Sequence, residues 1–133
     1  MDLYAQNILD RYKTPFYKDK FKHGDLQHKE ANHSCGDVVE IGLKFENGKV
    51  TEYSFTGSGC AISMASADIL GDVIEGMNEK EVLELDFKDI QEVLGIPIGL
   101  RRSKCALLPL LTLQNGVLLK GGEKTKEWTS YSL

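Results

Sequence analysis

Three cysteines and one aspartate are the residues of this chain whose chemistry points to a functional site. Cys35 and Asp37 are separated by a single glycine, and Cys60 and Cys105 follow further along the chain. Thiolates bind Zn²⁺ and iron–sulfur clusters, and they are also nucleophiles toward sulfur. Three cysteines and one carboxylate are enough to fill the tetrahedral shell of Zn²⁺. We therefore expect these four residues to form one exposed site that holds metal or sulfur.

The positions of the cysteines favour this interpretation over that of buried filler, although their spacing alone does not identify a metal. The chain has no C-x-x-C pair, which argues against both a standard zinc motif and a thiol redox enzyme. Each cysteine, however, stands at the predicted boundary of a helix or strand, whereas filler cysteines usually lie within apolar stripes. If the segment around Cys35 is extended, Asp37 points to the same side as Cys35. The alternative for Asp37 is a hydrogen bond to nearby N–H groups of a turn.

Two of the thiols are expected to be more reactive than a solvated cysteine. Cys60 and Cys105 are predicted near the amino termini of helices, where free N–H groups and the helix dipole stabilise a thiolate. Arg101, Arg102 and Lys104 add positive charge near Cys105, although they could equally form a solvated basic face. We expect Cys35 or Cys105 to be the nucleophile.

The three histidines precede Cys35 in a polar segment. His23, His28 and His33 recur at a spacing of five, which does not align them on one helical face. We expect exposed loop residues here, with His33 as an alternative ligand because it lies close to Cys35.

Periodicity predicts the elements that must position these residues. Val39, Ile41, Leu43 and Phe45 alternate with mostly polar residues, and Asn47-Gly48 predicts a hairpin turn after them. The predicted strands cover residues 25–31, 38–45 and 49–56, and the predicted helices cover residues 3–12, 60–75, 78–85 and 87–94, with a last helix from residues 101–103 onward. Strands precede most of the helices without a βαβ rhythm. This order predicts an α+β fold, a small antiparallel sheet of about three strands with helices packed on one face.

Length and composition predict one domain. The chain of 133 residues suits a single domain over residues 1–133, and the polar segment 121–133 is compatible with a flexible tail. The net charge of −4 argues against a dedicated nucleic-acid binder and against a binder of anionic membranes. The amino-terminal residues lack a signal pattern and no apolar run is long enough to span a bilayer, so we expect a cytoplasmic protein without membrane or nucleic-acid partners. In that reducing compartment the odd number of cysteines does not indicate disulfides.

Three motifs in order resemble the IscU/SufU family, which includes the NifU amino-terminal domain and serves iron–sulfur cluster biogenesis. The motifs are Ser34-Cys35-Gly36-Asp37, Gly57-Ser58-Gly59-Cys60-Ala61-Ile62-Ser63 and Arg102-Ser103-Lys104-Cys105-Ala106-Leu107, and the likeness extends from about residue 3 to about residue 113. The resemblance implies an exposed cluster of Cys35, Asp37, Cys60 and Cys105. It also implies a cysteine desulfurase as sulfur donor and downstream Fe–S acceptor or assembly proteins as further partners.

Departures from the family's subtypes bear on which branch the chain resembles. Lys104 stands where the IscU branch has a histidine, and the chaperone-recognition loop of that branch is missing. Arg102, Lys104 and Cys105 resemble the Arg-x-Lys-Cys pattern of SufU. The separation of 105 − 60 = 45 positions is too short for the insertion typical of SufU. The chain therefore resembles a short SufU.

The resemblance leads to one favoured hypothesis and two alternatives. The favoured one is a zinc-dependent sulfur acceptor, in which Zn²⁺ is held by Cys35, Asp37, Cys60 and Cys105 and a thiolate takes persulfide sulfur. The first alternative is a scaffold on which the same residues assemble and transfer a [2Fe–2S] cluster. The second, from a different class, is a zinc-stabilised interaction module.

Overall fold

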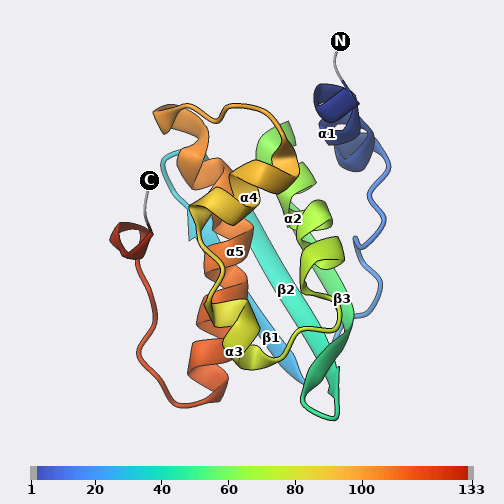
Figure 1. Ribbon diagram of the computed structural model, residues 1–133, viewed down its shortest axis with the longest axis vertical. Helices are drawn as coiled ribbons and strands as arrows, with labels where there is room; N and C mark the ends of the chain where they lie inside the picture. Colours follow the sequence, from blue (N-terminus) through green and yellow to red (C-terminus); the bar gives the residue numbers. More distant parts are fainter. Residues whose placement is uncertain (1–2, 132–133) are drawn as a thin grey trace.

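The computed structural model describes residues 3–131 and has the predicted α+β architecture, with helices over one face of a small sheet (Figure 1). In chain order the elements are α1 (Leu3–Lys13), β1 (Leu26–Asn32), β2 (Asp37–Glu46), β3 (Lys49–Ser58), α2 (Ala61–Ile74), α3 (Glu79–Leu83), α4 (Phe87–Leu94), α5 (Leu100–Lys120) and the 3₁₀ turn η1 (Trp128–Ser130). No helix among the described residues is long and apolar enough to cross a membrane.

The sheet has the strand order β1-β2-β3, and both pairings are antiparallel. Asn47 and Gly48 both adopt positive φ angles, of 54° and 78°, in the turn between β2 and β3. This is the backbone that a tight hairpin requires, so the turn predicted from the sequence is confirmed. The register places Asn32 opposite Asp37, where the chain turns from β1 into β2.

The helices cover one face of the sheet, as predicted. The long helix α5 packs on β1 and β2, α2 packs on β3 and beside α5, and α1 lies against the outer side of α2 (Figure 1). Val39, Ile41 and Leu43 of β2 are fully buried, which accounts for the alternation seen in the sequence. They share one hydrophobic core with the leucines of α5 and the apolar face of α2.

The irregular segment after α1 protects the β3 edge of the sheet. Asp19 N donates to Phe55 O at 2.8 Å and Phe55 N donates to Tyr17 O at 3.2 Å, so the segment extends the hydrogen bonding beyond β3. Covering an edge strand in this way prevents pairing with another chain.

A polar contact fixes α1 to α2. The Arg11 guanidinium donates from Nε to the buried carboxylate of Asp68 and from Nη1 to Asp72 at 2.7 Å. Asp68 also accepts from Tyr17 N at 2.7 Å. Ile8 is the buried apolar residue of α1, and the ion pair adds a polar contact with α2 to its packing.

The carboxy-terminal segment lies along α5 as far as it is described. Asn115 of α5 accepts from Lys126 N at 2.7 Å, and Gln114 Oε1 accepts from Tyr131 OH at 2.5 Å. The sequence allowed a flexible tail over residues 121–133, of which residues 132–133 lie outside the described part. The buried amides of Asn115 and Gln114 hold the described part of this segment against α5.

Candidate metal centre

Cys35 lies at the tip of the turn between β1 and β2, where its thiol is exposed. Asn32 O accepts from Cys35 N at 3.2 Å and from Gly36 N at 2.9 Å, and these bonds close the turn. Gly36 has a φ of 74°, which a residue with a side chain rarely adopts. The glycine in the Cys-Gly-Asp motif thus lets the chain reverse directly after the thiol.

Asp37 begins β2 and is 1% exposed. Its Oδ1 accepts from Cys60 N at 3.1 Å, which joins the first motif to the second. A Cβ on Gly59 would lie 2.5 Å from Asp37 Oδ1 and 2.6 Å from Ser63 Oγ. Only glycine leaves room for the carboxylate at this position.

Cys60 is the N-cap of α2, as the sequence predicted. Its Sγ accepts from Ser63 N at 3.5 Å, and its thiol is half-buried. A sulfur in this position satisfies a backbone N–H of the first helical turn, which has no partner within the helix.

Cys105 lies in the second turn of α5 and is 4% exposed. Its thiol donates to Cys35 Sγ across an S–S distance of 3.5 Å. Burial raises the pKa of Cys105 well above the usual thiol range, and the neighbouring Cys35 thiol and Asp37 carboxylate act in the same direction. This burial opposes the activation of Cys105 that the sequence led us to expect from the helix terminus and the nearby cations. The cause is that Cys105 lies beyond the first turn and faces inward, while Arg101, Arg102 and Lys104 are exposed.

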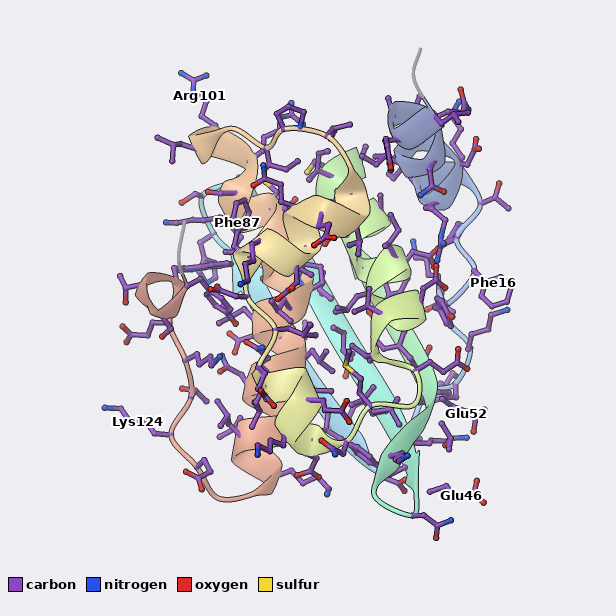
Figure 2. All side chains as sticks on the ribbon, viewed as in Figure 1. Phe16, Glu46, Glu52, Phe87, Arg101 and Lys124 are labelled. Atoms are coloured by element: carbon purple, nitrogen blue, oxygen red, sulfur yellow. The ribbon has the colours of Figure 1, made fainter. Side chains whose placement is uncertain are left out.

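Three of the four predicted residues come together at one end of the sheet, and the fourth, Cys60, lines the same hollow without belonging to the close group. Ligand atoms of Cys35, Asp37 and Cys105 lie within 4.8 Å of one another. Cys60 lines the same hollow of about 340 Å³, together with Gly59, Arg101 and Arg102. The Arg101 side chain projects outward at this end of the molecule (Figure 2).

The donor set fits Zn²⁺. Asp37 Oδ2 is buried and has no hydrogen-bond partner, so it is the carboxylate oxygen left for a ligand. The Cys35 and Cys105 sulfurs and an Asp37 oxygen form the close group, and the Cys60 sulfur, which lines the same hollow, would complete a tetrahedral shell; thiolates suit an iron–sulfur cluster as well.

Neighbouring residues that the sequence singled out have other positions. His33 is exposed in the turn before Cys35, and it is not part of the ligand group found among the described residues. The Lys104 ammonium lies 5.9 Å from the centre of the Trp128 ring, a cation–π contact with the carboxy-terminal segment.

Sequence reasoning missed two residues that shape the site. Gly59 leaves the room described above, and its place in a Gly-Ser-Gly turn was the available indication. Asn32 is 3% exposed although it ends a polar edge strand. Sequence reasoning missed it because an asparagine at the end of a polar strand usually indicates an exposed turn residue.

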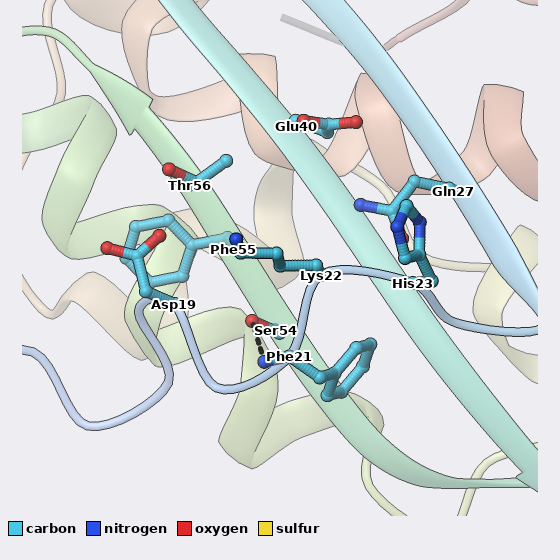
Figure 3. Close-up of a pocket in the computed structure, with 9 residues that line it drawn as sticks. All are labelled: Asp19, Phe21, Lys22, His23, Gln27, Glu40, Ser54, Phe55 and Thr56. Carbon is cyan, nitrogen blue, oxygen red and sulfur yellow. Dashed lines mark hydrogen bonds between the residues drawn. The ribbon is translucent and has the colours of Figure 1, made fainter.

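A separate hollow of about 510 Å³ lies away from the cysteines (Figure 3). It is lined by Asp19, Phe21, Lys22, His23, Gln27, Glu40, Ser54, Phe55 and Thr56. Its charges are mixed and it contains no thiol, so it offers none of the chemistry of the cysteine site.

The fold and the site define a small α+β domain that gathers three thiols and one carboxylate at the end of a three-stranded sheet. The NifU-like N-terminal domain family matches residues 3–124. The chain belongs to this family, with relatives among the SufU and IscU proteins of iron–sulfur cluster assembly, and the resemblance read from its three motifs is confirmed.

Individual relatives come from both branches. The zinc-dependent sulfurtransferase SufU of Bacillus subtilis is 30% identical over 137 residues, covering 90% of this chain and 92% of that protein. The iron–sulfur cluster assembly scaffold protein IscU of Streptococcus pyogenes is 36% identical over 87 residues, covering 62% of this chain and 52% of that protein.

A solved structure supports the same assignment. The putative iron–sulfur cluster assembly scaffold protein for the SUF system from Fervidobacterium islandicum superposes with a TM-score of 0.63 at 26% identity, covering 84% of this chain and 94% of that one.

Proposed function

We propose that this protein accepts persulfide sulfur from a cysteine desulfurase at a Zn²⁺ site formed by Cys35, Asp37, Cys60 and Cys105. The observation that carries the proposal is the close approach of Cys35, Asp37 and Cys105 next to an unpartnered carboxylate oxygen. The similarity to a zinc-dependent sulfurtransferase along nearly the whole chain supports it.

Differences in exposure favour Cys35 over Cys105 as the acceptor. The nucleophile in sulfur exchange must reach a sulfur held by another protein, and reactivity depends on access. Cys35 is exposed at the tip of a turn, whereas Cys105 is buried. Cys105 instead donates to the Cys35 sulfur from the buried side, with the two Sγ atoms 3.5 Å apart.

The transfer is an exchange of one S–S bond for another. The Cys35 thiolate attacks the outer sulfur of the desulfurase persulfide, a bond forms between Cys35 Sγ and that sulfur, and the bond to the donor cysteine breaks. The donor cysteine leaves as a thiolate and Cys35 carries the persulfide, so there is no net oxidation or reduction. A downstream Fe–S acceptor or assembly protein then takes the sulfur.

Bound Zn²⁺ would keep the thiols deprotonated at neutral pH. Cys60 and Cys105 would hold the ion from rigid helix positions. Cys35 lies in a turn and can swing out without disturbing the sheet. Asp37 offers an oxygen, a weaker ligand for zinc than thiolate, which suits a site that must open.

The test combines metal content with sulfur transfer. Protein purified anaerobically without added metal should contain about one zinc per chain, as one tetrahedral site requires. Changing Cys60 to Ser should remove that zinc. Incubation with the cognate desulfurase and cysteine should add the mass of one sulfur atom to Cys35, and Cys35→Ser should abolish the transfer. Zinc binding without any effect on desulfurase turnover would instead support the interaction module.

A scaffold for a [2Fe–2S] cluster is the second candidate, favoured by the similarity to the streptococcal IscU. The same three thiols and Asp37 would hold the cluster. Anaerobic protein containing iron and acid-labile sulfide, with visible charge-transfer absorption, would support the scaffold over the sulfur acceptor.

A further inference from the structure

Two buried side-chain polar atoms in the described part of the chain lack a hydrogen-bond partner, and both lie at the same place in the fold. They are Asn32 Nδ2 and Asp37 Oδ2. Buried polar groups are almost always paired, so an unpaired donor and an unpaired acceptor call for an explanation. Asp37 Oδ2 has no partner because it is the oxygen available to a metal ion. That reason does not apply to Asn32 Nδ2, which is a donor and cannot bind a cation.

The register places the two side chains together. Asn32 ends β1 and lies directly opposite Asp37, which begins β2. Directly opposed residues of an antiparallel pair point to the same face, with Cβ atoms about 5 Å apart. Both are buried at 3% and 1% exposure, respectively, so water does not satisfy them from outside.

The backbone of Asn32 has a structural task of its own. Its carbonyl closes the turn that carries Cys35 by accepting from Cys35 N and Gly36 N. Any residue can supply that carbonyl, so the turn does not account for a buried carboxamide.

We propose that Asn32 is a positioning residue for the metal centre, whose Nδ2–H donates to Asp37 Oδ2 when the site is loaded. This inference rests on the proposed zinc site. Cys60 N already holds Oδ1, so a second donor on Oδ2 would fix how the carboxylate faces the ion. Donors to a ligating carboxylate orient the ligand and commonly change metal affinity 10- to 100-fold when removed.

Without bound metal, the unpaired Asn32 amide should lower the stability of the protein. An unpaired buried amide destabilises a fold, because its hydrogen bonds to water are lost and not replaced. Removing the donor should therefore stabilise the metal-free protein, or leave it unchanged, while weakening metal binding. A merely structural asparagine would show the opposite pattern.

The experiment compares Asn32→Leu, which keeps the approximate shape without the donor, with the unaltered full chain. Zn²⁺ affinity is measured by competition with a chromophoric chelator, and thermal unfolding is measured after metal removal. We expect Zn²⁺ to bind roughly 10- to 100-fold more weakly and the melting temperature of the metal-free protein to stay equal or rise. Co²⁺ in place of Zn²⁺ should show a shifted d–d absorption band. Asn32→Ala repeats the test should the leucine variant fail to fold.

A matched control comes from the other end of the sheet. Asn78 caps α3 and accepts from Glu81 N at 2.9 Å, so Asn78→Ala should lower the melting temperature and leave Zn²⁺ affinity unchanged. An Asn32 variant that binds Zn²⁺ within about twofold of the unaltered protein, or an Asn32→Leu protein that loses metal-free stability, overturns the role of Asn32 alone. An unaltered protein that binds neither Zn²⁺ nor Co²⁺ overturns the proposed site as well.

Discussion

Replacing Gly59 with alanine tests whether the position of Asp37 sets the metal affinity of the site. The added Cβ would lie 2.5 Å from Asp37 Oδ1 and 2.6 Å from Ser63 Oγ. Reaching even 3.0 Å requires the carboxylate to move by 3.0 − 2.5 = 0.5 Å. Neither neighbour can yield freely, because both are buried and both are hydrogen-bonded to the Cys60 backbone.

The expected loss follows from the bond that the alanine displaces. A hydrogen bond to a charged group contributes about 1.5–3 kcal/mol. At about 1.4 kcal/mol for each factor of ten, a site that loses it should bind Zn²⁺ roughly ten- to a hundredfold more weakly. No positive φ is involved at Gly59, so the effect arises from the contact with Asp37.

The assay is Zn²⁺ competition against a chelator of known affinity, with Gly99→Ala as the control. Gly99 is the N-cap of α5 close to the same site, yet a Cβ there would meet nothing within 4 Å. The control should bind zinc as the unaltered protein does. A Gly59→Ala protein with unchanged zinc affinity would refute the view that Asp37 is held in place for the metal.

Three further predictions concern the site and the fold that carries it. Arg11→Ala leaves the buried Asp68 carboxylate without its cation and should destabilise the protein by about 2–3 kcal/mol. The loss is smaller than for a fully buried pair because the Arg11 side chain is 19% exposed. Equal urea midpoints for Arg11→Ala and the control Lys13→Ala would contradict this prediction. In metal-free protein the raised pKa of Cys105 favours the folded state, and this contribution is fully present below the unfolded thiol pKa of about 8.5. Above that pH the free energy of unfolding should fall by at most about 1.4 kcal/mol per pH unit. Chemical denaturation between pH 8 and 10 should show that slope, and its persistence in Cys105→Ala would exclude this thiol as the cause. Asp37→Ala removes both an oxygen ligand and the acceptor of Cys60 N, so zinc retained after dialysis should drop; full retention would exclude Asp37 from the ligand set.

Much of the fold was predictable because its local patterns agree with its global arrangement. The alternation through Val39, Ile41 and Leu43 follows from burial on one face, and Asn47-Gly48 specifies the turn. The grouping of the cysteines was predictable for a related reason. Cys35 and Cys60 stand directly before β2 and α2, Cys105 lies in the second turn of α5, and the beginnings of these three elements lie at one end of the sheet.

Features that depend on the rotation of an element about its axis were not predictable. Cys105 faces inward because of how α5 lies on the sheet, and the sequence shows only that cations stand beside it. Gln114 and Asn115 dock the carboxy-terminal segment, yet on a leucine-rich helix they give no sign of the backbone groups they bind. Asn32 was missed because its burial is a property of the paired strands.

The contact between Lys104 and Trp128 gives the molecule a built-in optical probe. Trp128 is the single tryptophan of the chain, and the lysine beneath its ring is the residue next to Cys105. Indole emission responds to a nearby cation and to exposure to water, so any event that shifts the start of α5 should change the fluorescence of the whole protein. The metal titrations proposed above should therefore change the emission of Trp128, without an attached dye.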